Sequence, residues 1–245
     1  MSRMRLDKCL GACGLGSRKE LRALVRAGHV TVNGQRAQSE SQPVDPEADD
    51  IQVDGLAIAY RRVIAVLLHK PAGVLSATAD LRQQTVLDLL PEELRRRGVA
   101  PVGRLDKDTT GLLLLTDDGE AAHALISPKR HVDKVYVATL DAPVGESDVA
   151  AFAGGVQLSD FTAAPAGLRP LPGLPPRAEV TLREGKFHQV KRMFAARGKA
   201  VIALHRTRFG PQVLDESLLP GSYRLLTPEE WARLRQAAGL SPTPS

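Results

Sequence analysis

One carboxylate in this 245-residue chain has the neighbours that a reactive group needs. Asp106 lies between two cations, Arg104 and Lys107, in a segment that also carries two threonine hydroxyls and ends at Gly111. An ionised carboxylate can act as a nucleophile or a base, and nearby positive charges favour its charged form. Asp106 is therefore a candidate catalytic residue.

The residues after Gly111 must hold this carboxylate in place. Four consecutive leucines, 112–115, predict a strand buried on both faces or a piece of buried helix. Asp117-Asp118-Gly119 then predicts a turn. A charged group on an irregular segment, anchored to a rigid buried element, is a frequent arrangement for binding and catalysis.

Two later segments could bring further groups to Asp106. Tyr136 follows a basic run that starts at Lys129, and an aromatic face can stack on an unstacked base with about 1–3 kcal/mol. The segment 186–208 contains seven Lys or Arg residues, Lys191 among them, and no acidic residue. Both segments suit an anionic partner.

A third basic group lies at the N-terminus. Residues 1–36 contain eight basic and two acidic side chains, whereas residues 37–60 contain six acidic and no basic ones. Ser17 and Glu20 form a predicted capping box that opens a helix to about Ala27, with Gly28 suited to its left-handed end. Asn33-Gly34 predicts a tight hairpin after a short strand. One face of the helix carries a basic stripe suited to phosphates: Arg18, Arg22 and Arg26.

The segment from Gly103 to Gly119 resembles the catalytic signature of pseudouridine synthases, in the family that modifies ribosomal RNA and includes the small-subunit synthase. The resemblance implies that Asp106, Tyr136 and Lys191 are the catalytic residues. It places Tyr136, from a Lys-x-Tyr motif, beside the target base, and it pairs Lys191, from a His-Gln-x-basic motif, with Asp106. Many members have arginine at the last position; lysine keeps the charge but lacks the two-pronged geometry. A Lys-Pro-x-Gly motif at 70–73 implies structural support for the site.

Residues 3–55 resemble the S4 RNA-binding domain, on their Ser-Arg helix start and Val-x-Val-Asn-Gly hairpin. Together the two resemblances imply an α+β chain: an S4-like domain with an acidic linker at 1–58, then a pseudouridine synthase domain at 60–237. The second domain would have a mixed, mainly antiparallel sheet flanked by helices, and 238–245 would be a flexible tail. The residues expected to contact RNA are Arg104, Arg18, Lys19, Arg22, Arg26, Lys129, Arg130, Lys186 and Arg192.

Local patterns predict the elements of the second domain. Strands are expected at 63–68, 132–140, 178–182 and 201–204, and helices at 85–90, 92–96, 120–126, 148–153, 187–196 and 228–236. Thr227 and Glu230 form a second predicted capping box, with proline at the first helical position. The segment 163–176 contains five prolines and is expected to be a loop.

The implied reaction breaks the C1′–N1 bond of a uridine, rotates the uracil and rejoins it through C5. The uridine must leave the stack first. No redox or hydrolytic step is involved, so no cofactor and no metal is expected. The resemblance is strongest to the member that modifies uridine 516 of 16S rRNA. The expected partner is this rRNA, free or in a pre-ribosomal particle, bound by a monomer.

Three alternatives stay open on the residues alone. A sister synthase would act on 23S rRNA, and a non-catalytic S4-type RNA-binding or assembly factor would have lost the chemistry. A two-carboxylate glycosidase would use Asp106 and Asp108, but at this spacing the pair is expected to point apart along an extended chain.

Composition sets broad limits. The net charge of +5 favours an anionic partner. Cys9 and Cys13 are four apart, share one helix face and are expected to be a small, buried, reduced pair. The sequence shows no secretory signal and no apolar run of about 18–20 residues, so a cytoplasmic protein without a membrane partner is expected.

Overall fold

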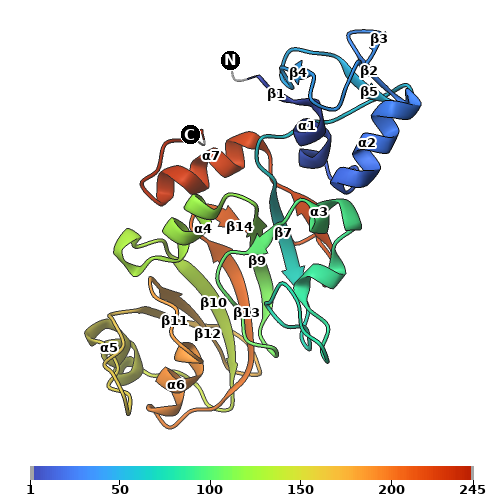
Figure 1. Ribbon diagram of the computed structural model, residues 1–245. Helices are drawn as coiled ribbons and strands as arrows, with labels where there is room; N and C mark the ends of the chain where they lie inside the picture. Colours follow the sequence, from blue (N-terminus) through green and yellow to red (C-terminus); the bar gives the residue numbers. More distant parts are fainter. Residues whose placement is uncertain (1–2, 244–245) are drawn as a thin grey trace. The chain divides into compact units, whose positions relative to one another are not determined.

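The computed structural model describes residues 3–243, which form two compact units (Figure 1). The first unit runs to Ile64 and also includes Leu90–Val99, and the second contains Ala65–Leu89 and the chain from Ala100 onward. These ranges differ from the expected 1–58 and 60–237 chiefly at the segment 90–99, which packs with the N-terminal residues.

Close packing at Gly14 explains that difference. Gly14 has a φ of +74°, and a Cβ built there would lie 2.5 Å from the carbonyl oxygen of Glu93. Arg96 also pairs with Glu20 at 3.7 Å. The backbone around Glu93 thus packs against the N-terminal residues of the same unit by an approach that only glycine permits.

The first unit packs two helices on short strands. Both helices bury leucines, Leu6 and Leu10 on one and Leu21 on the other, against Val30 and Ile51. The capping box at Ser17 and the left-handed Gly28 are confirmed. The elements are β1 (Met4–Arg5), α1 (Leu6–Ala12), α2 (Arg18–Ala27), β2 (Val30–Val32), β3 (Gln35–Arg36), β4 (Pro43–Val44), β5 (Ile51–Val53), β6 (Leu56–Ala57) and α3 (Glu92–Arg96).

The strands of this unit form a small antiparallel sheet. Its order is β3-β2-β5-β6, and β1 pairs separately with β4. Asn33 and Gly34 both have positive φ in the turn between β2 and β3. Because that turn geometry disfavours most side chains, the predicted Asn-Gly hairpin is confirmed for a physical reason.

The second unit is built on one large sheet. Its strands run in the order β11-β12-β10-β13-β9-β7-β15, and two short strands, β8 and β14, pair with β9 and β13. Among the described residues the β9–β13 pair is parallel and the other pairs are antiparallel. The expected mixed, mainly antiparallel sheet is therefore confirmed. The strands are β7 (Ala65–Lys70), β8 (Ala100–Pro101), β9 (Thr110–Thr116), β10 (Lys134–Leu140), β11 (Gly167–Leu171), β12 (Arg177–Leu182), β13 (Val201–Phe209), β14 (Gln212–Val213) and β15 (Tyr223–Leu225).

The four leucines of β9 are fully buried, so the strand alternative holds for residues 112–115. The helices of this unit are α4 (Gly119–Ile126), α5 (Glu146–Gly154), α6 (Gln189–Ala195) and α7 (Pro228–Ala237), with short 3₁₀ turns at Val86–Leu89 and Pro128–Arg130. Figure 1 shows α5 and α6 near one end of the sheet and α4 and α7 near the other. The Thr227 capping box of α7 is confirmed.

The prediction of a loop over 163–176 is wrong in its middle. Residues Gly167–Leu171 form β11, in which Pro170 pairs in register with Ala178. Proline cannot donate to a sheet, but β11 is an edge strand with a partner on one side alone. The edge position therefore accommodates the proline that suggested a loop.

The predicted helix over 187–196 begins two residues late. His188 has a left-handed φ of 50° and precedes α6, so Phe187 and His188 stand outside the helix. At the other end of the chain, Arg235 of α7 donates from Nη2 to Glu120 of α4 at 3.0 Å and from Nε to the carbonyl of Ser241 at 2.8 Å. Residues up to Ser241 thus contact the body of the unit, and the end of the expected tail, 244–245, lies outside the described residues.

Across residues 3–243, no helix has the length and apolar character that a membrane span requires.

Candidate active site

The loop that carries Asp106 lies between β8 and β9, and hydrogen bonds from Ser76 and Lys70 hold its backbone in place. Ser76 Oγ donates to the carbonyl of Leu105 at 2.8 Å and accepts from the Leu105 amide at 3.1 Å. The buried ammonium of Lys70, at the end of β7, donates to the carbonyls of Lys107 at 3.2 Å and Thr109 at 2.9 Å. These bonds fix the backbone on both sides of Asp106, in line with the structural role expected of the Lys-Pro-x-Gly motif.

Burial has a measurable consequence for Lys70. Its side chain is fully buried, and removal from water lowers the pKa of the ammonium to about 8. The charges of Asp108 and Asp106 act in the opposite direction and keep the pKa from falling further. Lys70 is therefore a buried cation that the loop carbonyls and two carboxylates stabilise.

Gly111 lets β9 approach β13 at the end of this loop. Its φ is +104°, and a Cβ there would lie 2.2 Å from the carbonyl oxygen of Arg206. Thr110 and Gly111 are the residues of β9 that pair in parallel with His205 and Arg206. The glycine of the signature is thus required where the two strands bring Asp106 and β13 together.

Two basic side chains from the segment 186–191 face the Asp106 carboxylate. Lys191 Nζ lies 3.4 Å from Asp106 Oδ2, and His188 Nε2 lies 3.6 Å from Asp106 Oδ1. Both side chains come from α6 or the residue before it. Both groups lie within ion-pair distance of the carboxylate.

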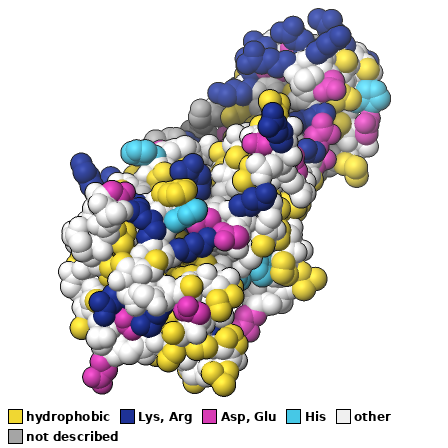
Figure 2. All heavy atoms as spheres, turned by 90° about the horizontal axis from the view of Figure 1, so that it is seen from below, with side chains coloured by type: hydrophobic (Ala, Val, Ile, Leu, Met, Phe, Trp, Pro, Cys, Tyr) yellow, Lys and Arg dark blue, Asp and Glu magenta, His cyan; other side chains and the backbone are white. Residues whose placement is uncertain are grey.

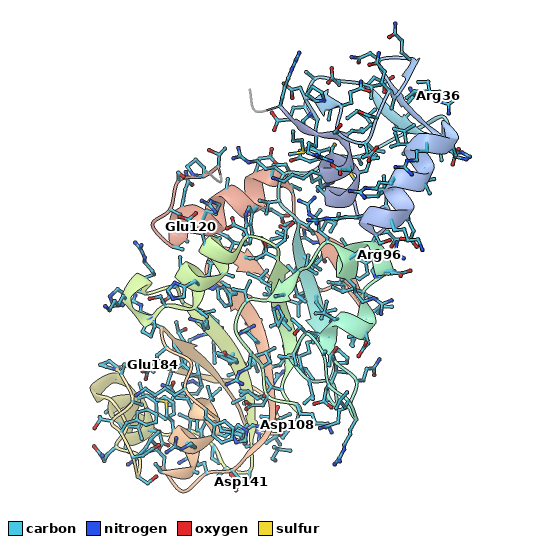
Figure 3. All side chains as sticks on the ribbon, in the orientation of Figure 1. Arg36, Arg96, Asp108, Glu120, Asp141 and Glu184 are labelled. Atoms are coloured by element: carbon cyan, nitrogen blue, oxygen red, sulfur yellow. The ribbon has the colours of Figure 1, made fainter. Side chains whose placement is uncertain are left out.

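Lys191 also bonds to a second carboxylate, and this corrects one expectation. Its Nζ donates to Asp108 Oδ1 at 2.6 Å, so Asp106 and Asp108 converge on one ammonium and do not point apart. They converge because the chain turns at 106–109, where the Thr109 amide donates to the Asp106 carbonyl. The hydrogen bond from Lys191 lowers the pKa of Asp108. Figure 3 labels Asp108, which lies just before β9 at the strand ends where β7 finishes.

Tyr136 approaches the site from β10. Its side chain is 7% exposed, and its hydroxyl oxygen accepts a long hydrogen bond of 3.4 Å from Arg206 Nη1. Arg206 is itself 2% exposed and donates from Nε to the carbonyl of Leu112 at 2.7 Å. Since arginine has no acceptor, the hydrogen of the Tyr136 hydroxyl stays free to donate elsewhere.

Two adjoining cavities surround Tyr136. The first, about 60 Å³, is lined by Asp106, His188, Leu182 and Leu204, among others. The second, about 160 Å³, is lined by the buried cations Lys134 and Arg206, among others. Both cavities are lined by Arg104, Tyr136, Gly185 and Lys186.

The loop that borders both cavities is ordered by Gln189. Its side chain accepts from the Lys186 amide at 2.9 Å and donates to Glu184 Oε1 at 2.5 Å. Gln189 is 4% exposed, so its amide is committed to these bonds and holds Gly185 and Lys186 at the cavity rim. Figure 3 labels Glu184 in this loop.

The structure separates the expected RNA-binding residues of this unit into two groups. Arg104 and Lys186 line the cavities. Lys129 and Arg130 are exposed on a 3₁₀ turn and line neither cavity. Arg192 also lies away from the cavities, because its guanidinium pairs with Asp160.

The basic stripe of the first unit is formed as predicted. Figure 2 shows many Lys and Arg side chains gathered on that unit. Arg22 pairs with Glu40 at 3.6 Å and remains 54% exposed. The exposed stripe on α2 consists of Arg18, Lys19, Arg22 and Arg26, which border a shallow surface hollow.

Sequence reasoning did not assign roles to three residues of this site. Phe187 and His188 lie in the segment predicted as a helix over 187–196. That prediction did not indicate that His188 faces Asp106. Arg206 is a buried cation of β13, and nothing in its spacing sets it apart from its basic neighbours. Among residues 3–243 no group of three or more His, Cys, Asp or Glu side chains is placed to hold a metal ion.

The chain is similar to known proteins over almost its whole length. Residues 64–196 match the model of the RNA pseudouridylate synthase family, and residues 4–50 match that of the S4 domain. An uncharacterized RNA pseudouridine synthase of Bacillus subtilis is 45% identical over 93% of this chain and 96% of its own length. The ribosomal small subunit pseudouridine synthase A of Escherichia coli K12 is 42% identical over 94% of this chain and 99% of its own. A crystal structure of a pseudouridylate synthase superposes with a TM-score of 0.66 at 38% identity, covering 94% of this chain and 99% of that one.

Proposed function

Because the chain belongs to the RNA pseudouridylate synthase family and carries an N-terminal S4 domain, we propose that it converts one uridine of 16S rRNA, uridine 516, to pseudouridine. The enzyme is an isomerase, and the relatives named ribosomal small subunit pseudouridine synthase A match 94% of the chain. The choice of 16S rRNA rests on those relatives. The chemistry rests on one observation, a carboxylate held between Lys191 and His188 at the wall of a cavity.

In this proposal Asp106 is the catalytic group, and Lys191 lies beside its carboxylate at 3.4 Å. The carboxylate acts on the target nucleotide once the uridine has left the stack. The C1′–N1 bond breaks, the rotated uracil bonds to C1′ through C5, the proton on C5 leaves and N1 takes up a proton, so the product is an isomer of uridine.

Tyr136 holds the base in this account. Tyr136 borders both adjoining cavities, the one of about 60 Å³ that Asp106 lines and the one of about 160 Å³ beside it. A uracil stacked on the tyrosine would lie across both cavities, next to Asp106. The free hydroxyl hydrogen of Tyr136 is available to a carbonyl of the base, since Arg206 occupies the oxygen from the other side.

The basic side chains hold the RNA backbone. Arg104 and Lys186, at the cavity rim, would contact phosphates next to the target. Arg18, Lys19, Arg22 and Arg26 would hold phosphates on the first unit, with Lys129, Arg130 and Arg192 as outer contacts. Phosphate contacts position a protein without reading sequence. We also propose that the enzyme is a monomer, that it is located in the cytoplasm, and that it acts on free rRNA or on a pre-ribosomal particle.

Mapping of pseudouridines tests the substrate. We expect 16S rRNA from cells that lack this protein to have lost one pseudouridine, at uridine 516, and to regain it when the wild-type chain is expressed. Loss of a site in 23S rRNA instead would identify a sister synthase. Unchanged 16S and 23S rRNA would leave an RNA-binding role without modification as the better explanation.

A further inference from the structure

One phenylalanine beside the proposed site, Phe187, is largely exposed to solvent. Phe187 is 71% exposed, whereas Phe152, Phe194 and Phe209 are at most 1% exposed. The fifth phenylalanine of the chain, Phe161, lies beneath the ammonium of Lys186 at 3.5 Å. Phe187 is thus the phenylalanine whose ring is left to solvent.

The ring of Phe187 is stacked on a residue of the active site. Its centroid lies 3.8 Å from that of the His188 ring, and the two planes differ by 17°. His188 in turn lines the smaller cavity and lies 3.6 Å from Asp106. With one face on the imidazole and 71% of its surface exposed, Phe187 presents its other face to solvent.

The backbone at His188 adopts a disfavoured conformation at the position of this stack. His188 has a φ of 50°, in the left-handed region that residues other than glycine rarely adopt. The α6 helix starts immediately afterwards, at Gln189, and Gln189 is buried and bonded to the preceding loop. The two rings are therefore fixed between a rigid helix and a fixed loop.

The surroundings of the stack suit nucleic acid. A single exposed apolar side chain needs no explanation by itself, but this one stacks on His188 and belongs to a segment with two cations, Lys186, which lines both cavities, and Lys191, which faces Asp106. Figure 2 shows Lys and Arg side chains interspersed with hydrophobic ones over one face of the larger unit. Aromatic rings within a basic groove hold single-stranded bases by stacking, independently of sequence.

We propose that Phe187 is a stacking platform for the base next to the target uridine in the RNA. The inference rests on the proposed function, since it takes the uridine to occupy the cavity beside Asp106 and Tyr136. When a uridine leaves the stack, its neighbour loses one stacking face. The exposed face of Phe187, one residue outside the cavity wall, replaces that lost contact, and it accepts any of the four bases.

Steady-state kinetics on an rRNA fragment that the wild-type enzyme modifies provide the first test. We expect Phe187→Ala to raise KM about 10-fold, as the loss of one base stack predicts, with a much smaller change in kcat. Phe187→Trp keeps a π face and should restore KM. Leu219→Ala is the matched control, because Leu219 is 70% exposed and lines neither cavity, and it should leave KM as it is.

A double-mutant cycle that combines Phe187→Ala with an altered RNA shows whether Phe187 acts by stacking on a base or only by providing apolar surface. An abasic nucleotide is placed on the 5′ or on the 3′ side of the target uridine. At one of these positions it should raise the KM of wild type about 10-fold, yet add nothing in Phe187→Ala.

Equal abasic penalties in wild type and Phe187→Ala on both sides would overturn the proposal, and so would a Phe187→Trp variant as poor as Phe187→Ala. The fragment comes from whichever rRNA the wild type modifies, 16S or 23S. An error in the proposed substrate therefore changes the fragment that is used and leaves the test of Phe187 intact.

Discussion

The ammonium of Lys191 donates a 2.6 Å hydrogen bond to Asp108, which is shorter than its 3.4 Å approach to Asp106. Asp108 is 73% exposed, whereas Asp106 is 26% exposed. The more exposed carboxylate thus anchors the lysine beside the less exposed one. Lysine permits this arrangement because its ammonium has three donors and no fixed plane.

Because Lys191 contacts both carboxylates, removing the lysine should lower activity more than removing the charge of Asp108. We expect Lys191→Met to lower kcat about 10²–10³-fold, because it removes the cation beside Asp106, with a smaller effect on RNA affinity. Asp108→Asn should cost less than about 10-fold, since an exposed ion pair contributes ~1 kcal/mol or less. Single-turnover rates at saturating RNA give both values, and a greater loss in Asp108→Asn than in Lys191→Met would reverse the assigned roles.

Tyr136 should act through its ring in binding. Tyr136→Phe keeps the aromatic face and is expected to bind RNA nearly as well as wild type, whereas Tyr136→Ala should lose ~1–3 kcal/mol of binding free energy. Equilibrium binding of the same RNA to the three proteins makes the comparison. If the phenylalanine and alanine variants bind equally poorly, the hydroxyl and not the ring makes the important contact.

Lys70 gives the second unit a characteristic dependence on pH. Its pKa is about 8 in the folded chain because burial removes the ammonium from water, against 10.5 for an ordinary lysine. Between these values the unfolded chain binds more protons, so the free energy of unfolding rises with pH. We expect a smaller rise in Lys70→Met.

Denaturant titrations across that pH range, followed by the fluorescence of the single tryptophan, Trp231 in α7, measure the rise. Lys134, whose pKa burial also lowers to about 8, keeps some rise in the variant. Identical slopes in wild type and Lys70→Met would show that Lys70 stays protonated or is exposed in solution.

The basic stripe of α2 should hold RNA without taking part in the chemistry. In Arg18→Ala/Arg22→Ala, RNA affinity should fall, and the slope of log affinity against log salt should decrease by up to about two. Turnover at saturating RNA should change little. Arg169→Ala is a suitable control, since Arg169 lies on β11 and pairs with Glu179 at 3.0 Å. A slope equal to that of wild type would remove Arg18 and Arg22 from the RNA contacts.

Local features of this fold were predictable because local chemistry decides them. The caps at Ser17 and Thr227 satisfy backbone amides within three residues, and the Asn33-Gly34 turn needs a backbone conformation that these residues tolerate. The edge strand β11 was missed because its environment, and not its sequence, decides whether Pro170 is acceptable.

The details of the site could not be predicted from spacing alone. Asp108 and Lys191 are 83 residues apart, and Tyr136 and Arg206 are 70 apart. The β10–β13 pairing brings Tyr136 and Arg206 together, and Asp108 meets Lys191 where the loop before β9 faces α6. The motifs indicated Asp106, Tyr136 and Lys191 but not which carboxylate the lysine binds more closely. That choice depends on the turn at 106–109, which Lys70 stabilises.

If the Asp106 carboxylate performs the chemistry, the Asp106→Asn variant should lose turnover. The amide has nearly the same shape, so the variant should fold and bind RNA as wild type does, while losing the charge that Lys191 stabilises. Pseudouridine formed on a saturating rRNA substrate is the measurement, with RNA affinity and Trp231 fluorescence as controls. We expect kcat of Asp106→Asn to fall about 10³-fold or more. Turnover close to wild type in a folded, RNA-bound Asp106→Asn enzyme would contradict the catalytic role of Asp106.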